Sequence, residues 1–259
     1  MSVKTSLLGA LIYTALALYA AAFAAGGARR RAGRALFAAG FVAAVSAVAW
    51  RGLSTGHIPL QNLFEVFLAM GALIWPLALL WGRLAGTASR SDPWIGIAML
   101  FPAGFVFSEH PRPLPPALQS PLFVPHVLVY LIAYILLFKA ATLAFRQFRP
   151  RPADDWHAAE RSAHRLAEWG YPALMLGLLL GAWWGKLAWG SYWHWDPKEM
   201  WALATWLIYT GYFHARTTLA PEARRARAAL LLAGFAAIVL TLTWVNLSRL
   251  FPGLHSYAM

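Results

Sequence analysis

Long apolar segments recur through the chain, and they constrain its fold more than any other feature. A helix needs about 20 mostly apolar residues to cross the hydrocarbon core of a bilayer, with roughly 17–25 tolerated. Eight segments reach or approach that length, at residues 6–26, 35–51, 64–81, 94–107, 122–145, 171–188, 200–219 and 228–247. The fourth is short and contains Pro102 and Gly104, so it gives the weakest signal. The sequence predicts an all-α integral membrane protein with about eight transmembrane helices.

The composition agrees with a membrane location. Of the 259 residues, 60% are hydrophobic and only 12% are charged, whereas about a quarter of an ordinary soluble domain is charged. A net charge of +12 would also suit a nucleic-acid partner, but the basic residues are divided among short stretches between the apolar segments. That division is typical of membrane topology. No repeat or flexible linker interrupts the sequence, so we expect a single domain over residues 1–259 and no nucleic-acid partner.

The basic residues also predict the orientation of the chain. The loops after the first, third, fifth and seventh segments hold fifteen arginines, whereas the opposite side holds six lysines and arginines. Because excess Lys and Arg stays on the cytoplasmic side, both termini should face outward. Only Lys4 precedes the first segment, which is longer than the core of a cleaved signal peptide, so we expect a retained helix. Residues 153–169 are expected to form an amphipathic helix on the cytoplasmic surface.

This topology places several histidines on the outer face of the membrane. His57 follows the second segment, His126 opens the fifth, and His255 follows the eighth. The stretch "WGSYWHWDPKEMW", residues 189–201, joins the sixth and seventh segments on the same face. Neutral imidazole is a common axial ligand of haem iron. Separated histidines around an aromatic loop therefore indicate a metal-porphyrin site.

The tryptophan-rich stretch has one simpler explanation. Seven of the fourteen tryptophans lie between Trp183 and Trp206, and Trp is enriched at membrane interfaces in general. Such aromatic belts spread over all helix ends, however, and the other outer loops are poor in Trp. Indole offers a large flat apolar face with one N–H donor, which suits a planar macrocycle. Asp196 before Pro197 is typical of a helix start, a role that explains Asp196 alone but not the tryptophans around it.

The same stretch resembles the WWD motif of the haem-handling protein family. Its ending, Asp-Pro-Lys-Glu-x-Trp, is similar to the CcsA (ResC) subunit of the system II cytochrome c synthase, whereas the CcmC branch of system I typically has an arginine there. Three further segments resemble CcsA segments in the same order: "GHIPLQNLFE" from residue 56, "LPPALQSPLFVPHVLVYLIAY" from residue 114 and the terminal "GLHSYAM". The resemblance covers nearly the whole chain after its first apolar segment.

The resemblance implies roles for three histidines. Two external histidines that flank the WWD loop are the implied ligands of the presented haem, and their positions match His126 and His255. His214 lies about 15 residues into the seventh segment, roughly 22 Å from the outer surface at 1.5 Å per residue. An ionisable residue at that depth is a functional candidate, although a histidine at the inner interface beside Arg216 would explain it too. The matching family histidine is implied to bind haem that arrives from the cytoplasmic side, with its second ligand on the partner protein CcsB (ResB).

Further residues are expected to hold the cofactor, haem b, on the outer face. Lys186, Lys198 and Arg249 are the cations available for its propionates, and Lys198 and Arg249 rank highest. His57 would support the site by hydrogen bonding, with Asn62 and Glu65 spaced three apart on one helical face. His194 is either an extra ligand or simply exposed, and no role is assigned to His110, His157 or His164. The expected haem contacts are Trp189, Gly190, Tyr192, Trp193, Trp195, Asp196, Lys198, Glu199, Trp201, Arg249 and His57.

The family implies a function in cytochrome c biogenesis as a haem lyase (synthase) subunit of the inner (plasma) membrane. The two thiols of an apocytochrome C-x-x-C-H motif would add across the haem vinyl groups. This chain has no cysteine, so it would supply orientation and iron ligation, and a thiol-reducing protein would take part indirectly. Two other function classes stay open at this point: a haem exporter or chaperone that forms no bond, and a scaffold that grips a partner without haem.

Overall fold

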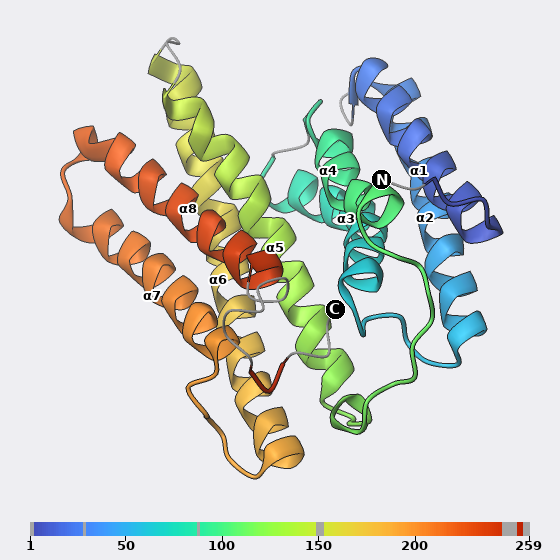
Figure 1. The fold of residues 1–259 in the computed structure, drawn as a ribbon. Helices are drawn as coiled ribbons and strands as arrows, with labels where there is room; N and C mark the ends of the chain where they lie inside the picture. The colour runs from blue at the N-terminus through green and yellow to red at the C-terminus, as the bar shows by residue number, and fades with distance from the viewer. Residues whose placement is uncertain (1–2, 28–29, 87–88, 149–152, 245–252, 256–259) are drawn as a thin grey trace. The chain divides into compact units, whose positions relative to one another are not determined.

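The computed structural model describes residues 3–27, 30–86, 89–148, 153–244 and 253–255. These residues form eight α-helices and no strand, which confirms the predicted all-α class for them (Figure 1). The helices are α1 (Leu7–Ala24), α2 (Arg31–Thr55), α3 (Leu63–Leu84), α4 (Asp92–Phe105), α5 (Phe123–Phe145), α6 (Ala153–Trp189), α7 (Pro197–Thr218) and α8 (Arg224–Val239). Three 3-10 turns, η2 (Pro116–Leu118), η3 (Arg146–Phe148) and η4 (Pro221–Ala223), and the π-helical η5 (Leu240–Trp244) complete the described elements.

Five helical segments of the described chain are long and apolar enough to cross a membrane. They span residues 7–24, 31–55, 63–83, 123–148 and 221–244, and so correspond to α1, α2, α3, α5 and the region of α8. At 1.5 Å per residue, the 14 residues of α4 are shorter than the roughly 30 Å hydrocarbon core. The chain is therefore a helical membrane protein, and the count of eight spans stays a prediction.

The sequence predicted the sixth segment and the amphipathic helix before it as separate elements, but α6 joins them. It runs without a break over 37 residues, with Pro172 inside it. A proline removes one backbone hydrogen bond and often kinks a helix, yet here the residues on both sides continue the same helix. The residues expected to lie on the cytoplasmic surface are thus a direct extension of the sixth segment.

The helices pack into two units, residues 1–118 and residues 119–259. In the first unit α1 packs on α2 and α4, and α3 packs on the same two helices. In the second unit α5 packs on α6 and α8, and α7 also packs on α6 and α8. Each unit is therefore a ring of four consecutive helices, and the expectation of a single domain stays a prediction.

Tyr19 of α1 lies at the centre of the first unit. Its ring packs edge-on against Phe37 of α2, with centroids 5.2 Å apart, and its hydroxyl donates to the carbonyl of Gly71 in α3 at 2.8 Å. Gly40 and Gly96 leave room for the ring, because a β-carbon at either position would approach it to 3.0 Å or less. One aromatic side chain thus contacts all three neighbouring helices.

A buried ion pair joins α2 to α3. Arg51 and Glu65 are almost fully buried, and the guanidinium Nε lies 2.9 Å from the carboxylate. Glu65 also accepts the backbone N–H of Gln61 at 2.8 Å, while Asn62 caps α3 by accepting the N–H of Glu65. Arg51 further donates to the carbonyl of Glu109 at 2.6 Å. Asn62 and Glu65 therefore fix the start of α3.

Removal of one partner from this buried pair should destabilise the protein strongly. We expect Arg51→Ala to cost about 3–5 kcal/mol, because Glu65 would keep a buried charge without its cation. The measurement is the thermal unfolding midpoint of the purified chain in detergent. Arg34→Ala is the control, since Arg34 is an exposed residue of the same helix, and equal midpoints for the two variants would contradict the expectation.

Candidate functional site

A face of small residues on α6 positions His126 near the start of α5. Gly177 and Gly181 lie one turn apart on α6, and a β-carbon at Gly181 would come within 2.6 Å of the His126 ring. Gly177 likewise faces the ring of Tyr130, which a β-carbon would approach to 3.0 Å. Small residues four apart allow close helix approach in membranes. The α5–α6 contact therefore holds the imidazole directly against the α6 backbone.

That close approach determines the protonation of the His126 ring. The Nδ1 atom lies 2.9 Å from the carbonyl oxygen of Gly177. A carbonyl can only accept, so Nδ1 carries the proton and donates it. The neutral ring then has its lone pair on Nε2, the form in which histidine binds a metal through Nε2.

Asp196 begins α7 in the manner expected from the sequence. Its side chain accepts the backbone N–H of Lys198 at 2.9 Å, and the side chain of Glu199 accepts the N–H of Asp196 at 3.2 Å. The Asp196 side chain also accepts the backbone N–H of Glu199, which completes a capping box, with Pro197 at the first helical position. The capping role that was the simpler reading of Asp196 is thus present.

Asp196 also binds the chain segment after α8. Its carboxylate accepts Nδ1–H of His255 at 3.0 Å and the backbone N–H of Leu254 at 2.6 Å. Only 3% of the Asp196 side chain and 14% of the His255 side chain are exposed. His255 therefore has the same tautomer as His126, with the proton on Nδ1 and the lone pair on Nε2.

The pKa values of this pair favour a carboxylate beside a neutral imidazole. Burial acts to raise the pKa of Asp196, but the hydrogen bond and charge of His255 and two backbone N–H groups outweigh it and lower the pKa to about 2. Burial lowers the pKa of His255, although its bond to Asp196 acts in the opposite direction. At neutral pH the donor in this bond is thus an uncharged ring and the acceptor is an anion.

The two predicted ligands meet around two tryptophans. His126 and His255 each lie 5.7 Å from Trp184, measured between ring centroids. Trp189 packs edge-on against Trp184 and His255, both at 4.8 Å, and against His194 at 6.0 Å. We call these five residues the aromatic–histidine cluster. It joins the start of α5, the end of α6, the loop before α7 and the segment after α8.

The rest of the WWD loop is more open. Tyr192 is 60% and Trp195 68% exposed, and Trp195 packs edge-on against the half-buried Trp193 at 6.0 Å. Trp195 has φ 57°, in the left-handed region that non-glycine residues rarely adopt. Backbone in that region tends to occur at binding sites. The Lys186 ammonium donates to the carbonyl of Gly190 at 2.8 Å and so closes the loop at its beginning.

Several predicted site residues lie elsewhere in their units or outside the described chain. His214 is exposed near the end of α7, far along the helix from Asp196. His57 belongs to the first unit, where its Nδ1 lies 3.0 Å from the carbonyl of Ile58. Arg249 lies outside the described residues. His194 is half-buried, and its Nδ1 lies 3.8 Å from the Glu199 carboxylate, too far for a hydrogen bond.

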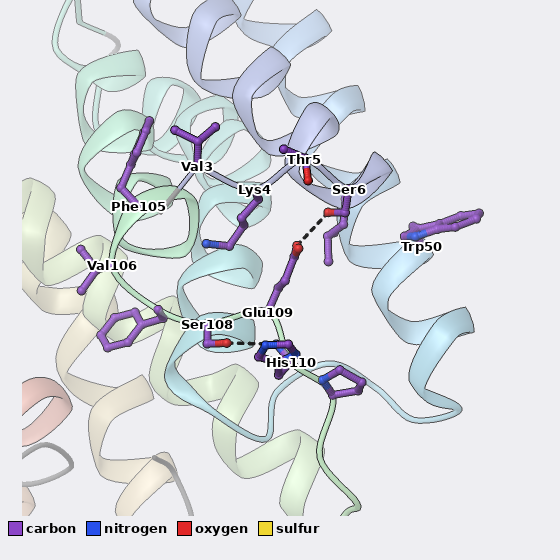
Figure 2. Close-up of a pocket in the computed structure, with 13 residues that line it drawn as sticks. Val3, Lys4, Thr5, Ser6, Trp50, Phe105, Val106, Ser108, Glu109 and His110 are labelled. Carbon is purple, nitrogen blue, oxygen red and sulfur yellow. Dashed lines mark hydrogen bonds between the residues drawn. The ribbon is translucent and has the colours of Figure 1, made fainter. Parts of the chain in front are cut away.

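The described residues of the first unit contain a pocket of about 550 Å³, which Figure 2 shows. It lies between the residues before α1, Trp50 of α2 and the segment after α4. Ser6 donates to the carboxylate of Glu109 at 2.9 Å, and Lys4 donates to the carbonyl of Gly104 at 3.2 Å. These bonds attach the N-terminal residues to the end of α4, so the polar side chains here serve the packing of the unit.

Sequence reasoning missed Trp184, which both predicted ligands contact. The sequence contained a signal for this contact, because Gly177, Gly181 and Gly185 repeat every four residues along α6. That spacing is typical of a close helix contact in membranes. The glycine repeat marks the face of α6 against which His126 packs, and Trp184 lies near the end of the same helix.

Comparisons with known proteins identify the family. The family model described as "Cytochrome C assembly protein" matches residues 5–255. The chain belongs to the cytochrome c assembly protein family. The match runs through both units and includes the aromatic–histidine cluster up to His255.

Curated relatives described as "Cytochrome c biogenesis protein CcsA" match most of the chain. The chain is 30% identical to the one from Synechococcus sp. (strain JA-2-3B'a(2-13)), over 80% of this chain and 79% of the relative. Identity is 32% to that of Synechococcus elongatus, over 80% and 81%, and 31% to that of Prochlorococcus marinus (strain NATL1A), over 90% and 87%. Within its family the chain is thus a CcsA-type protein, as the WWD loop predicted, and its role is in cytochrome c biogenesis.

The α6 glycine face gives a direct test of the site geometry. We expect Gly181→Ala to displace His126 and to lower the thermal unfolding midpoint in detergent, because the added methyl overlaps the imidazole. Gly211→Ala is the matched control, since a β-carbon there has no atom within 4 Å and alanine favours a helix. A Gly181→Ala midpoint at or above that of the control would show that the two helices do not approach this closely.

Proposed function

We propose that this chain holds haem b at the extracytoplasmic face of the inner (plasma) membrane and promotes its thioether attachment to apocytochrome c. One observation carries the proposal: His126 and His255, from distant parts of the sequence, contact the same indole of Trp184. The CcsA relatives support it, because they are named for cytochrome c biogenesis. The chain would then be one subunit of a cytochrome c haem lyase (synthase).

The residues of the cluster fit haem. Both imidazoles donate their Nδ1–H to the protein, to Gly177 and to Asp196, and so have the lone pair on Nε2. Bound haem supplies the iron that these nitrogens ligate and the two vinyl groups that react with thiols. Trp184 and Trp189 offer flat apolar faces beside the ligands.

The exposed part of the WWD loop would orient the cofactor and its client. Trp195 and Tyr192 present large rings to the surroundings, where they can cover a planar macrocycle or contact the apocytochrome. Lys198 and Arg249 remain the proposed partners of the propionates, since buried or half-buried anions need cationic donors. Since the chain has no cysteine, both thiols come from the apocytochrome motif, kept reduced by another protein.

His214 would receive haem from the cytoplasmic side. Its side chain is exposed on α7, a position open to a second ligand from another chain. A CcsB (ResB)-type membrane protein is the proposed donor of that ligand. The orientation assumed here, with eight spans and both termini outside, follows from the excess of arginine in alternate loops.

An absorption spectrum of the purified chain tests the haem site. We expect a Soret band that is lost in the His126→Ala, His255→Ala double variant, because both iron ligands are then absent. His157→Ala should keep the band, since this exposed histidine lies at the other end of α6 from the cluster. A haem-free wild-type chain that still binds its partner would instead support a scaffold without haem.

Cytochrome c maturation tests the reaction itself. The chain and a CcsB-type partner are expressed with a C-x-x-C-H reporter in a host that lacks its own maturation system, and covalent haem on the reporter is stained after denaturing electrophoresis. We expect covalent haem with wild-type and at least a tenfold loss with His255→Ala. Normal maturation without the chain would favour a haem exporter or chaperone that forms no bond.

A further inference from the structure

Asp196 makes contacts in two directions. Toward its own helix it accepts the N–H of Lys198, as an N-cap does, and toward the segment after α8 it accepts the N–H of Leu254 and the Nδ1–H of His255. A cap requires only the first of these bonds. The other two bind a segment 58 and 59 residues away, so capping does not account for them.

The approach of the segment after α8 to Asp196 is close. At Gly253 any β-carbon would overlap the carboxylate of Asp196, so the backbone passes directly over it. The next two residues supply the donors to that carboxylate. The carboxylate is thus enclosed by the start of α7 and by the segment that bears His255.

We propose that Asp196 is a positioning residue that acts through His255. Its carboxylate sets the tautomer and orientation of the His255 ring and makes Nε2 a stronger donor to the metal, without touching the haem. This inference rests on the proposed function and changes the role expected for Asp196 from the sequence, which was contact with the cofactor.

The effect of Asp196 on His255 comes from the hydrogen bond at Nδ1, the ring nitrogen that does not ligate the iron. A metal-ligating histidine usually donates its other N–H to a carboxylate or a carbonyl, which fixes its tautomer and raises its basicity. An anionic acceptor draws the Nδ1 proton more strongly than a neutral one, because charge-assisted hydrogen bonds are roughly twice as strong. His255 donates to a carboxylate, whereas His126 donates to the Gly177 carbonyl. The two ligands are therefore inequivalent, and His255 is the stronger donor.

The reduction potential of the bound haem tests this role. Asp196→Asn removes the charge but keeps an oxygen acceptor that caps helices as well as aspartate does. Glu222→Gln is the matched control, because it removes the charge of an exposed carboxylate in the same unit, beyond the end of α7 that lies away from Asp196. In a spectroelectrochemical titration of the full-length haem-loaded chain, Asp196→Asn should raise the potential, since a weaker donor stabilises ferric iron less. Glu222→Gln should leave the potential unchanged.

Two results would overturn the proposal. An Asp196→Asn potential equal to that of wild-type would show that the Asp196 charge does not act on the iron. An equal shift in Glu222→Gln would show that the loss of any carboxylate charge has the same effect. If Asp196→Asn does not fold, resonance Raman spectra of the single-ligand variants decide instead. The Fe–His stretch of ferrous haem should be higher in His126→Ala, where His255 is the ligand, than in His255→Ala, and equal frequencies contradict the proposal.

These outcomes are separate from those of the proposed function. A wild-type chain without a Soret band refutes haem binding and leaves no potential to measure. A normal Soret band with an unchanged potential in Asp196→Asn refutes only the role of Asp196.

Discussion

The geometry of the site depends on the contacts that the Asp196 carboxylate makes. This carboxylate caps α7 and accepts two further hydrogen bonds from residues 254 and 255. A buried carboxylate is costly unless its oxygens have donors, and here backbone N–H groups of both segments and the His255 ring supply them. The hydrogen bond from His255 adds a directed contact to the edge-on packing of its ring against Trp189. The acid of the motif thus connects the loop to His255, the proposed ligand from the far end of the sequence.

A second contact, of a different kind, positions His126, the other proposed ligand. His126 is held by helix packing, because Gly177 and Gly181 let α5 approach α6 closely enough for a ring-to-carbonyl hydrogen bond. Both contacts leave the lone pair on Nε2, and both rings pack on Trp184. One proposed ligand is thereby held by a charged side chain and the other by the backbone. In the proposed haem site, His255 would be the stronger donor and His126 the weaker one.

Hydropathy and capping signals were sufficient to predict the helices. The eight α-helices of the described chain correspond to the eight apolar segments, because both depend on local composition. The continuity of α6 was missed, since Pro172 and the change from polar to apolar residues resemble a boundary. The helix cap at Asp196 was also predicted, because the residues that indicate it are adjacent to it in the sequence.

The contacts between distant residues could not be predicted in the same way. Family resemblance selected His126 and His255, but no local pattern around either histidine indicated that Trp184 contacts both. Nor could the bond from His255 to Asp196 be read from residues 59 positions apart. The glycine repeat of α6 was the available signal, and it indicates a close helix contact without naming the partner helix. The side of the membrane on which the cluster lies stays a prediction from the arginine distribution.

In the proposed site His126 and His255 ligate one iron atom. Electron–nuclear double resonance of ferric haem, in a chain labelled with ¹⁵N-histidine, tests this ligation. We expect couplings from two histidine nitrogens in wild-type and from one in each single alanine variant. A wild-type spectrum with one coupled histidine, or one that neither substitution changes, would contradict it.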